Sequence, residues 1–267
     1  DPKLVWGLLP RFVGVLYVLG FGALIPQHSF MPGSPSLAPP GAQQARMRRD
    51  FGMRRFFEFP SILWIDCSDR TLRAVPIVGV AGGLAAILGG PYAVYCLALC
   101  WILWVSLESR GLLFPWDTML QEFGFLVLFL PATQLLPDLH ATAEPLPSVA
   151  FMVRWFVVRL MLGFGKDKFI GANKSDRLYL RGFFVWMPLP TPLGWLAHHA
   201  PARLLRWMLA FMFFAEVIAP VLGLFAGPPR VISFTVMSML MIGIHATGNW
   251  GFFNVGYILL CCCLLDT

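Results

Sequence analysis

Charged residues are scarce in this chain of 267 residues: 13% are Asp, Glu, Lys or Arg, whereas 58% are hydrophobic. A soluble domain carries about 25% charged residues. Half that fraction leaves too little polar surface to cover a globular fold, and the mean hydropathy of +0.71 agrees. The composition therefore excludes an ordinary soluble domain and indicates a polytopic membrane protein.

Cysteines and catalytic motifs are equally sparse where chemistry would need them. Of the six cysteines, Cys67 alone lies in a polar segment, which excludes a disulfide framework in the loops. No His or acid is spaced to complete a zinc site with Cys96 and Cys100. The sequence also lacks a Gly-rich phosphate loop and a nucleophile elbow. We therefore predict no catalytic residue, no metal site, no cofactor and no enzymatic activity.

Long apolar segments dominate what is present. A helix that spans a bilayer needs about 20 apolar residues and satisfies its own backbone hydrogen bonds. Several of the segments are nearer 15 residues long, so we predict an all-α transmembrane bundle of six to eight helices. The apolar segments are Leu4–Ile25, Ala74–Leu88, Tyr92–Leu107, Phe123–Leu136, Val149–Gly165, Leu204–Phe225, Val231–Ala246 and Phe252–Leu265.

Two polar loops, 26–73 and 166–203, interrupt what we predict to be a single transmembrane domain over 1–267. Of the 20 Lys and Arg residues, 15 lie on the side that faces both loops in an eight-span arrangement. The positive-inside rule places that side in the cytoplasm, stroma or matrix. Anionic lipid headgroups account for such basic residues, so membrane lipids are the predicted partners and nucleic acid is not.

Four charged residues lie deep inside the apolar segments, away from their ends: Arg11, Arg154, Arg159 and Glu216. A charge at the bilayer centre costs several kcal/mol or more, so such residues face other helices or a wet cavity. Glu216 is the single acid deep in its segment, and we expect it to pair with one of the three arginines. The set is interpreted as a polar brace between helices, with a polar cavity or proton path as the alternative.

Small residues and prolines predict how the helices meet and bend. Gly79 and Gly83 are four residues apart, a spacing that allows close approach of two helices. We predict packing inside the bundle there, with dimerisation as the alternative. Pro10, Pro131 and Pro220 interrupt apolar segments and predict kinks.

Several uncommon strings occur in one order along the chain, and together they resemble the lipase maturation factor family. The strings are FPSILWI at 59–65, WDTMLQEFGFL at 116–126, RWFVVRLMLGFGKDKF at 154–169, PTPLGWLAHHAP at 190–201 and TGNWGFFN at 247–254. The opening RFVGVLYVLGFGALIPQ from Arg11 is also similar, so the likeness covers nearly the whole chain. It also suggests distant kinship with the membrane domain of vitamin K-dependent carboxylases.

The resemblance implies a non-enzymatic folding or assembly factor of the endoplasmic reticulum whose partners are client proteins or other membrane proteins. It places the large loops in the lumen, against the positive-inside count, and would make Asn173 in Asn173-Lys174-Ser175 a glycosylation acceptor. The loop after RWFVVRLMLGFGKDKF lacks the cysteines that family members carry. This departure keeps an alternative open: a structural accessory subunit of a large complex in a plastid or mitochondrial membrane.

Overall fold

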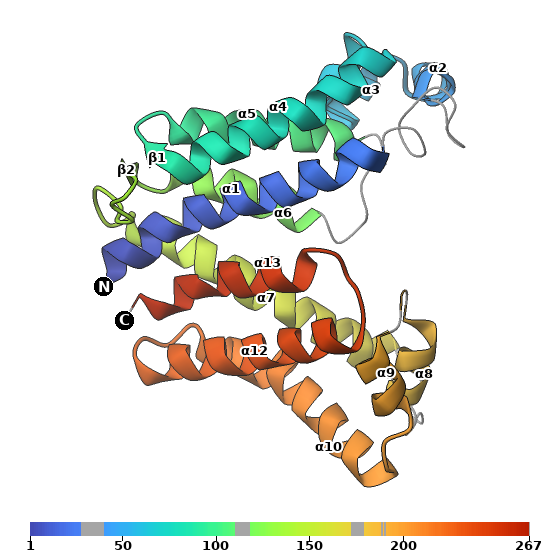
Figure 1. Cartoon of the computed structure of the whole chain (residues 1–267), viewed down its shortest axis with the longest axis vertical. Helices are drawn as coiled ribbons and strands as arrows, with labels where there is room; N and C mark the ends of the chain where they lie inside the picture. The colour runs from blue at the N-terminus through green and yellow to red at the C-terminus, as the bar shows by residue number, and fades with distance from the viewer. Residues whose placement is uncertain (28–39, 110–117, 172–178, 188, 190, 267) are drawn as a thin grey trace. The chain divides into compact units, whose positions relative to one another are not determined.

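The computed structural model of the chain is built from α-helices (Figure 1), which confirms the predicted all-α polytopic class. It describes residues 1–27, 40–109, 118–171, 179–187, 189 and 191–266. The chain forms two compact units. The N-terminal unit comprises Trp6–Pro145, and the C-terminal unit comprises Leu146–Thr267 with Asp1–Val5.

Eight helical stretches correspond to the eight predicted apolar segments. Among the described residues, five stretches are long and apolar enough to cross a membrane: Pro2–Gln27, Asp69–Leu88, Pro147–Lys166, Ala202–Leu222 and Pro228–Thr247. Three more are apolar but shorter: Ala93–Glu108, Thr118–Phe129 and Phe253–Leu265. The segment expected at Phe123–Leu136 is corrected, because its helix begins at Thr118 and its last residues form a strand.

In the N-terminal unit, helix α4 (Asp69–Leu88) and helix α5 (Ala93–Glu108) form an antiparallel hairpin (Figure 1). Ser68 begins α4 by accepting the backbone N–H of Thr71. The helix ends at strand β1 (Gly89–Gly90), where both glycines take positive φ, +81° and +85°. Strand β1 pairs antiparallel with β2 (Thr133–Leu135), which follows helices α6 (Thr118–Leu126) and η4 (Val127–Phe129).

Helix α1 (Pro2–Gln27) packs against α4 with almost no space between their backbones. A Cβ atom on Gly83 would lie 2.8 Å from the carbonyl oxygen of Gly14, and a Cβ on Gly14 would lie 2.9 Å from that of Gly83. Gly79 lies against the ring of Phe21. The predicted packing of Gly79 and Gly83 inside the bundle is confirmed.

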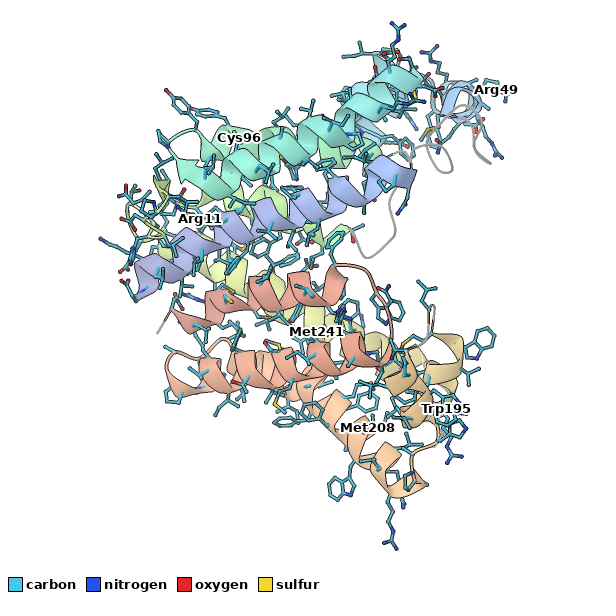
Figure 2. All side chains as sticks on the ribbon, viewed as in Figure 1. Arg11, Arg49, Cys96, Trp195, Met208 and Met241 are labelled. Carbon is cyan, nitrogen blue, oxygen red and sulfur yellow. The ribbon has the colours of Figure 1, made fainter. Side chains whose placement is uncertain are left out.

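The predicted polar loop 26–73 contains several short helices at the end of the unit away from β1 (Figure 1). They are α2 (Pro40–Phe51), η1 (Gly52–Arg54), α3 (Arg55–Glu58) and η2 (Ile62–Trp64). Figure 2 shows Arg11 of α1 and Arg49 of α2 near opposite ends of this unit. Most of the unit's basic residues therefore lie at one end of its long helices.

The C-terminal unit packs α7 (Pro147–Gly171), α12 (Pro228–Thr247) and α13 (Phe253–Cys261) around a shared core. Its other elements are α8 (Tyr179–Trp186), α9 (Pro192–His198), α10 (Ala202–Phe213), η5 (Phe214–Ile218), α11 (Ala219–Leu222) and η6 (Cys262–Leu265). The buried Tyr257 hydroxyl of α13 donates to the carbonyl of Val157 on α7 at 2.8 Å. Helices α8 and α9 lie within the predicted loop 166–203, so this loop also contains helical structure.

The three prolines act differently from one another. Pro10 lies inside α1, whereas Pro131 follows the last turn of η4. Pro220 follows η5, a π-helical turn over Phe214–Ile218. Because Pro220 lacks an N–H group and its ring crowds the preceding turn, the helix adjusts its hydrogen bonds just before it.

Candidate functional site

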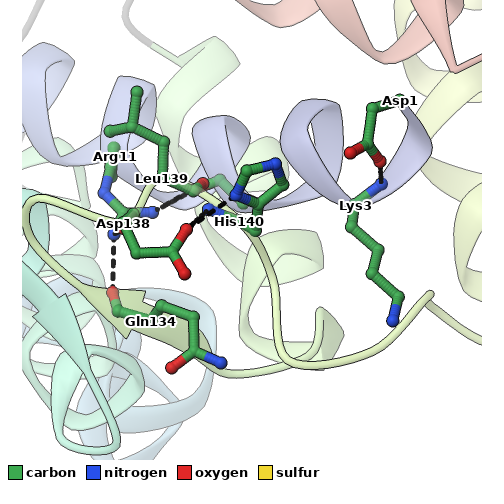
Figure 3. A network of polar contacts seen from close by, with 8 residues as sticks. Asp1, Lys3, Arg11, Gln134, Asp138, Leu139 and His140 are labelled. Atoms are coloured by element: carbon green, nitrogen blue, oxygen red, sulfur yellow. Dashed lines mark hydrogen bonds and ion pairs between the residues drawn. The ribbon is translucent and has the colours of Figure 1, made fainter.

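The buried charges in the two units are the candidate site, and Arg11 is the best defined of them. Its side chain is buried on α1, and its guanidinium donates to four backbone carbonyls (Figure 3). The acceptors are Gly7 at 2.7 Å, Leu139 at 3.2 Å, Gln134 at 2.6 Å and Asp138 at 2.9 Å. The planar fork of Arg suits acceptors spread over a turn and a strand.

The segment that Arg11 holds is a folded hairpin over residues 133–142. Thr133 and Ala141 form an antiparallel bridge, and the N–H of Gln134 donates to the carbonyl of His140 at 2.9 Å. Gly7 lets the hairpin touch α1, because a Cβ there would meet the backbone of Leu139. Arg11 therefore joins a membrane-spanning helix to the hairpin at its end and does not pair with Glu216 as expected.

Asp138 stabilises the same hairpin from outside the membrane-spanning segments. Its carboxylate accepts the backbone N–H of His140 at 2.9 Å and lies 2.6 Å from that residue's Nδ1 (Figure 3). These hydrogen bonds, the backbone one first, lower the pKa of Asp138 below its ordinary value. The carboxylate thus fixes the turn while the carbonyl of the same residue accepts from Arg11.

Glu216 is fully buried on η5 and forms its ion pair with Lys168 of α7. The expected arginine partner is therefore wrong. Gly165 explains the choice, because it brings the α7 backbone against Val217 and Glu216. Lys168 is less than one helical turn beyond Gly165, so its ammonium reaches the carboxylate. Burial and the charge of Glu216 also raise the pKa of Tyr179 on α8.

Arg154 pairs with Asp266, which follows η6, and not with Glu216. Arg230, at the start of α12, donates to the other oxygen of that carboxylate at 3.0 Å. The Asp266 side chain is 5% exposed and the two arginines are 15% and 13% exposed. One buried carboxylate therefore ties together α7, α12 and the segment after α13.

Arg159 differs from the other three predicted residues because its side chain is exposed on α7. Its guanidinium lies 5.8 Å from the centre of the Phe156 ring, within cation–π range. The structure therefore splits the predicted brace into separate contacts: Arg11 with carbonyls, Glu216 with Lys168, and Arg154 with Asp266.

Sequence reasoning missed Lys168, Asp266 and Arg230 as partners. Lys168 lies close to Arg159 in the sequence, within the string RWFVVRLMLGFGKDKF. Its position was therefore a signal that Lys168, like Arg159, was a candidate partner for Glu216. Asp266 is 112 residues from Arg154, and no local pattern links the two. In the part of the chain that the structure describes, no group of three or more His, Cys, Asp or Glu could hold a metal ion. Asn173 lies outside the described residues.

Two of the family-like strings hold a loop against a helix. In FPSILWI, the Ser61 hydroxyl donates to the carbonyl of Ser106 on α5 at 2.8 Å. In PTPLGWLAHHAP, the Thr191 hydroxyl donates to the carbonyl of Ala246 on α12 at 2.6 Å and caps α9. Gly194 then packs against the carbonyl of Thr247, which begins TGNWGFFN. The strings PTPLGWLAHHAP and TGNWGFFN are therefore in contact in the folded chain.

Comparison with known families matches residues 5–267 to the model described as Lipase maturation factor transmembrane domain. The chain belongs to the lipase maturation factor family. Similar curated proteins include Lipase maturation factor 2 of Rattus norvegicus, 30% identical over 95% of this chain. Lipase maturation factor 2 of Xenopus laevis is 27% identical over 98% of the chain, and Lipase maturation factor 1 of Homo sapiens is 27% identical over 92%.

The match places this chain in the transmembrane part of longer family members. The chain spans 39%, 38% and 46% of those three proteins' own lengths, respectively. No solved structure matches the chain. Family membership and the apolar helices together establish an integral membrane protein similar to lipase maturation factors.

Proposed function

We propose that this chain is the membrane part of a non-enzymatic factor that helps secreted lipases fold or assemble in the endoplasmic reticulum. The single observation that carries the proposal is the family match over residues 5–267. The geometry is compatible with it, because Arg11, Arg154 and Glu216 serve contacts between helices and loops. Client proteins are the proposed partners, and the compartment is proposed from the family alone.

The test is a rescue experiment in cells that lack lipase maturation factors. Because the chain spans less than half of its relatives, it replaces the matching region inside human Lipase maturation factor 1. We expect the chimera to restore secretion of an active lipase, measured as activity per amount of lipase protein. A chimera that accumulates in the membrane without raising that specific activity would overturn the proposal.

A second measurement separates this proposal from an accessory-subunit function. The unmodified chain is extracted gently from its native membrane and analysed on native gels with mass spectrometry. Association with secretory client proteins supports the folding factor. Migration at fixed stoichiometry with a respiratory or photosynthetic complex would contradict it.

A further inference from the structure

A groove in the C-terminal unit is not explained by the contacts that hold the unit together. It lies between α7 and the stretch from α10 through η5, and its volume is about 910 Å³. Cavities of about 300–1,000 Å³ are typical of sites for small molecules. The wall is apolar apart from Arg159 and Lys166 of α7, and includes Gly163 and Ile218.

Small residues and the π-helical turn shape this groove. Gly163 faces open space, since a Cβ atom built on it meets no heavy atom within 4 Å. Ala210 of α10, another small residue, lines the opposite side of the groove. A π-helical turn adds a residue to the turn and shifts the faces of the helix, which presents Phe214 and Ile218 to the groove. These apolar side chains are 39% and 54% exposed, so the protein itself does not cover them.

The charges of the groove are of one sign. Arg159 and Lys166 are seven residues apart, which places them on one face of α7 with about 10 Å of rise between them. Among the described lining residues none is acidic. The neighbouring Glu216 is buried, and its carboxylate forms its ion pair with Lys168. A membrane-embedded wall with two cations therefore matches an occupant with an anionic group and a long apolar chain.

A second hollow continues the groove along α10. It has a volume of about 430 Å³, shares Ala210 with the first hollow, and is lined also by Arg203, Arg206 and Trp207. Trp and basic residues are enriched at the depth of lipid headgroups. Trp207 is 75% exposed in the first turns of α10. The continuous surface thus runs from residues typical of the membrane interface to an apolar wall, as a phospholipid does.

We propose that the groove between α7 and α10–η5 binds an anionic phospholipid of the surrounding bilayer. The phosphate is held between Arg159 and Lys166, and one acyl chain lies on the wall formed by Gly163, Ala210 and Ile218. Arg203 and Arg206 attract the headgroup at the membrane surface. The proposal goes beyond lipase maturation and does not depend on it.

The test measures lipid retention by native mass spectrometry on the purified full chain in a neutral detergent. The probes are palmitoyl-oleoyl phosphatidylserine and palmitoyl-oleoyl phosphatidylcholine, whose acyl chains are identical. We expect several-fold higher occupancy by phosphatidylserine. A basic residue near a membrane surface contributes about 1 kcal/mol toward an anionic lipid, so Arg159→Gln and Lys166→Gln should each reduce the preference about fivefold.

Matched variants keep the test independent of folding. Lys3→Gln removes an exposed cation outside the groove and should leave the preference unchanged. Gly163→Leu, at a position where a Cβ meets no heavy atom within 4 Å, should fill the groove and lower occupancy by both lipids, whereas Gly22→Leu, where a Cβ also meets none, should not. Equal retention of both lipids by the unmodified chain would overturn the proposal. So would an unchanged preference in a folded Lys166→Gln variant together with unchanged occupancy in Gly163→Leu.

Discussion

The buried charges of this protein are compensated by two different kinds of partner. Arg11 is surrounded by backbone carbonyls, whereas Arg154 and Lys168 each meet a carboxylate. A carbonyl dipole balances a cation only when several point at it, and the hairpin over 133–142 supplies three of the four that contact Arg11. The shape of the cation therefore matters more at Arg11 than at Lys168.

We predict that Arg11→Lys is nearly as damaging as Arg11→Met. One ammonium cannot reach carbonyls on both sides of the hairpin, and a hydrogen bond to a charged group is worth about 1.5–3 kcal/mol. Both variants should lower the melting temperature in detergent by a loss of at least about 2 kcal/mol of stability. Arg49→Lys on exposed α2 is the control and should melt like the unmodified chain. A stable Arg11→Lys variant would show that charge alone suffices.

The carboxylate of Asp138 should titrate below the ordinary Asp pKa of about 4. Because its pKa is lowered in the fold, its stabilisation of the hairpin is present above pH 4 and is lost as the pH falls through the lowered value. A carbon-13 NMR titration, assigned with Asp138→Asn, measures the midpoint. His140→Ala should raise the midpoint while leaving it below 4, since the backbone N–H of residue 140 remains. A midpoint at or above 4 in the unmodified chain contradicts the hairpin geometry.

Lys168 and Glu216 should show strong coupling in a double-mutant cycle. Removing one partner of a buried ion pair costs about 3–5 kcal/mol, whereas replacing both by apolar residues is often neutral. Lys168→Met should cost more than Glu216→Leu, because the Lys168 side chain is 21% exposed and can move toward water whereas Glu216 cannot. The double variant should recover most of the loss in thermal unfolding. Additive losses would mean that the two side chains do not interact.

The positions of Arg11, Arg154 and Glu216 as buried charges were readable from the sequence, but their partners were not. Arg11, Arg154 and Glu216 stand out because each interrupts an apolar segment. Every residue has a backbone carbonyl, so no residue type in the sequence identifies the acceptors of Arg11. Glu216 was expected to meet an arginine because arginines are the evident cations of the spans; Gly165 selects Lys168 instead by closing the distance between α7 and η5.

At the scale of elements, apolar length predicted the helices better than it predicted their ends. The apolar run Phe123–Leu136 suggested one helix, yet Pro131 cannot continue it and the chain turns into β2. The short helices within 26–73 and 166–203 were missed because α2 is polar and α8 has only 8 residues, too few to give a membrane-span signal. Their contacts, such as Thr191 with Ala246, depend on residues distant in the chain.

The contact between α1 and α4 predicts opposite effects of one substitution at two glycines. Gly83→Ala should destabilise the chain, because the new Cβ would lie 2.8 Å from the Gly14 carbonyl oxygen and the helices must separate. Gly22→Ala should be neutral or stabilising, since its Cβ meets nothing and Ala favours a helix by about 1 kcal/mol over Gly. Thermal unfolding of both variants in the same detergent is the measurement. Equal effects would show that α1 and α4 do not approach this closely.

At the scale of the whole molecule, two expectations about orientation oppose each other. The positive-inside count puts the 15 basic residues of one side in the cytoplasm, stroma or matrix, whereas the family resemblance puts the large loops in the lumen. Helix α7 provides a way to decide between them. Its 25 residues rise about 37 Å, enough to cross a hydrocarbon core of about 30 Å. A helix that crosses the bilayer places the chain before Pro147 and the chain after Gly171 on opposite sides of the membrane.

Glycosylation of the chain before and after α7 reports the orientation. Asn173 belongs to an acceptor sequence, and His140→Asn creates another, because Ala141 and Thr142 follow it. For a lumenal 166–203 loop, we expect an endoglycosidase-sensitive shift in the unmodified chain made with microsomes, and its loss in Asn173→Gln. The double variant Asn173→Gln/His140→Asn should stay unmodified. If the double variant is glycosylated instead, the hairpin over 133–142 is lumenal, the positive-inside count is correct, and the lumenal placement of the large loops that the family resemblance implies is wrong.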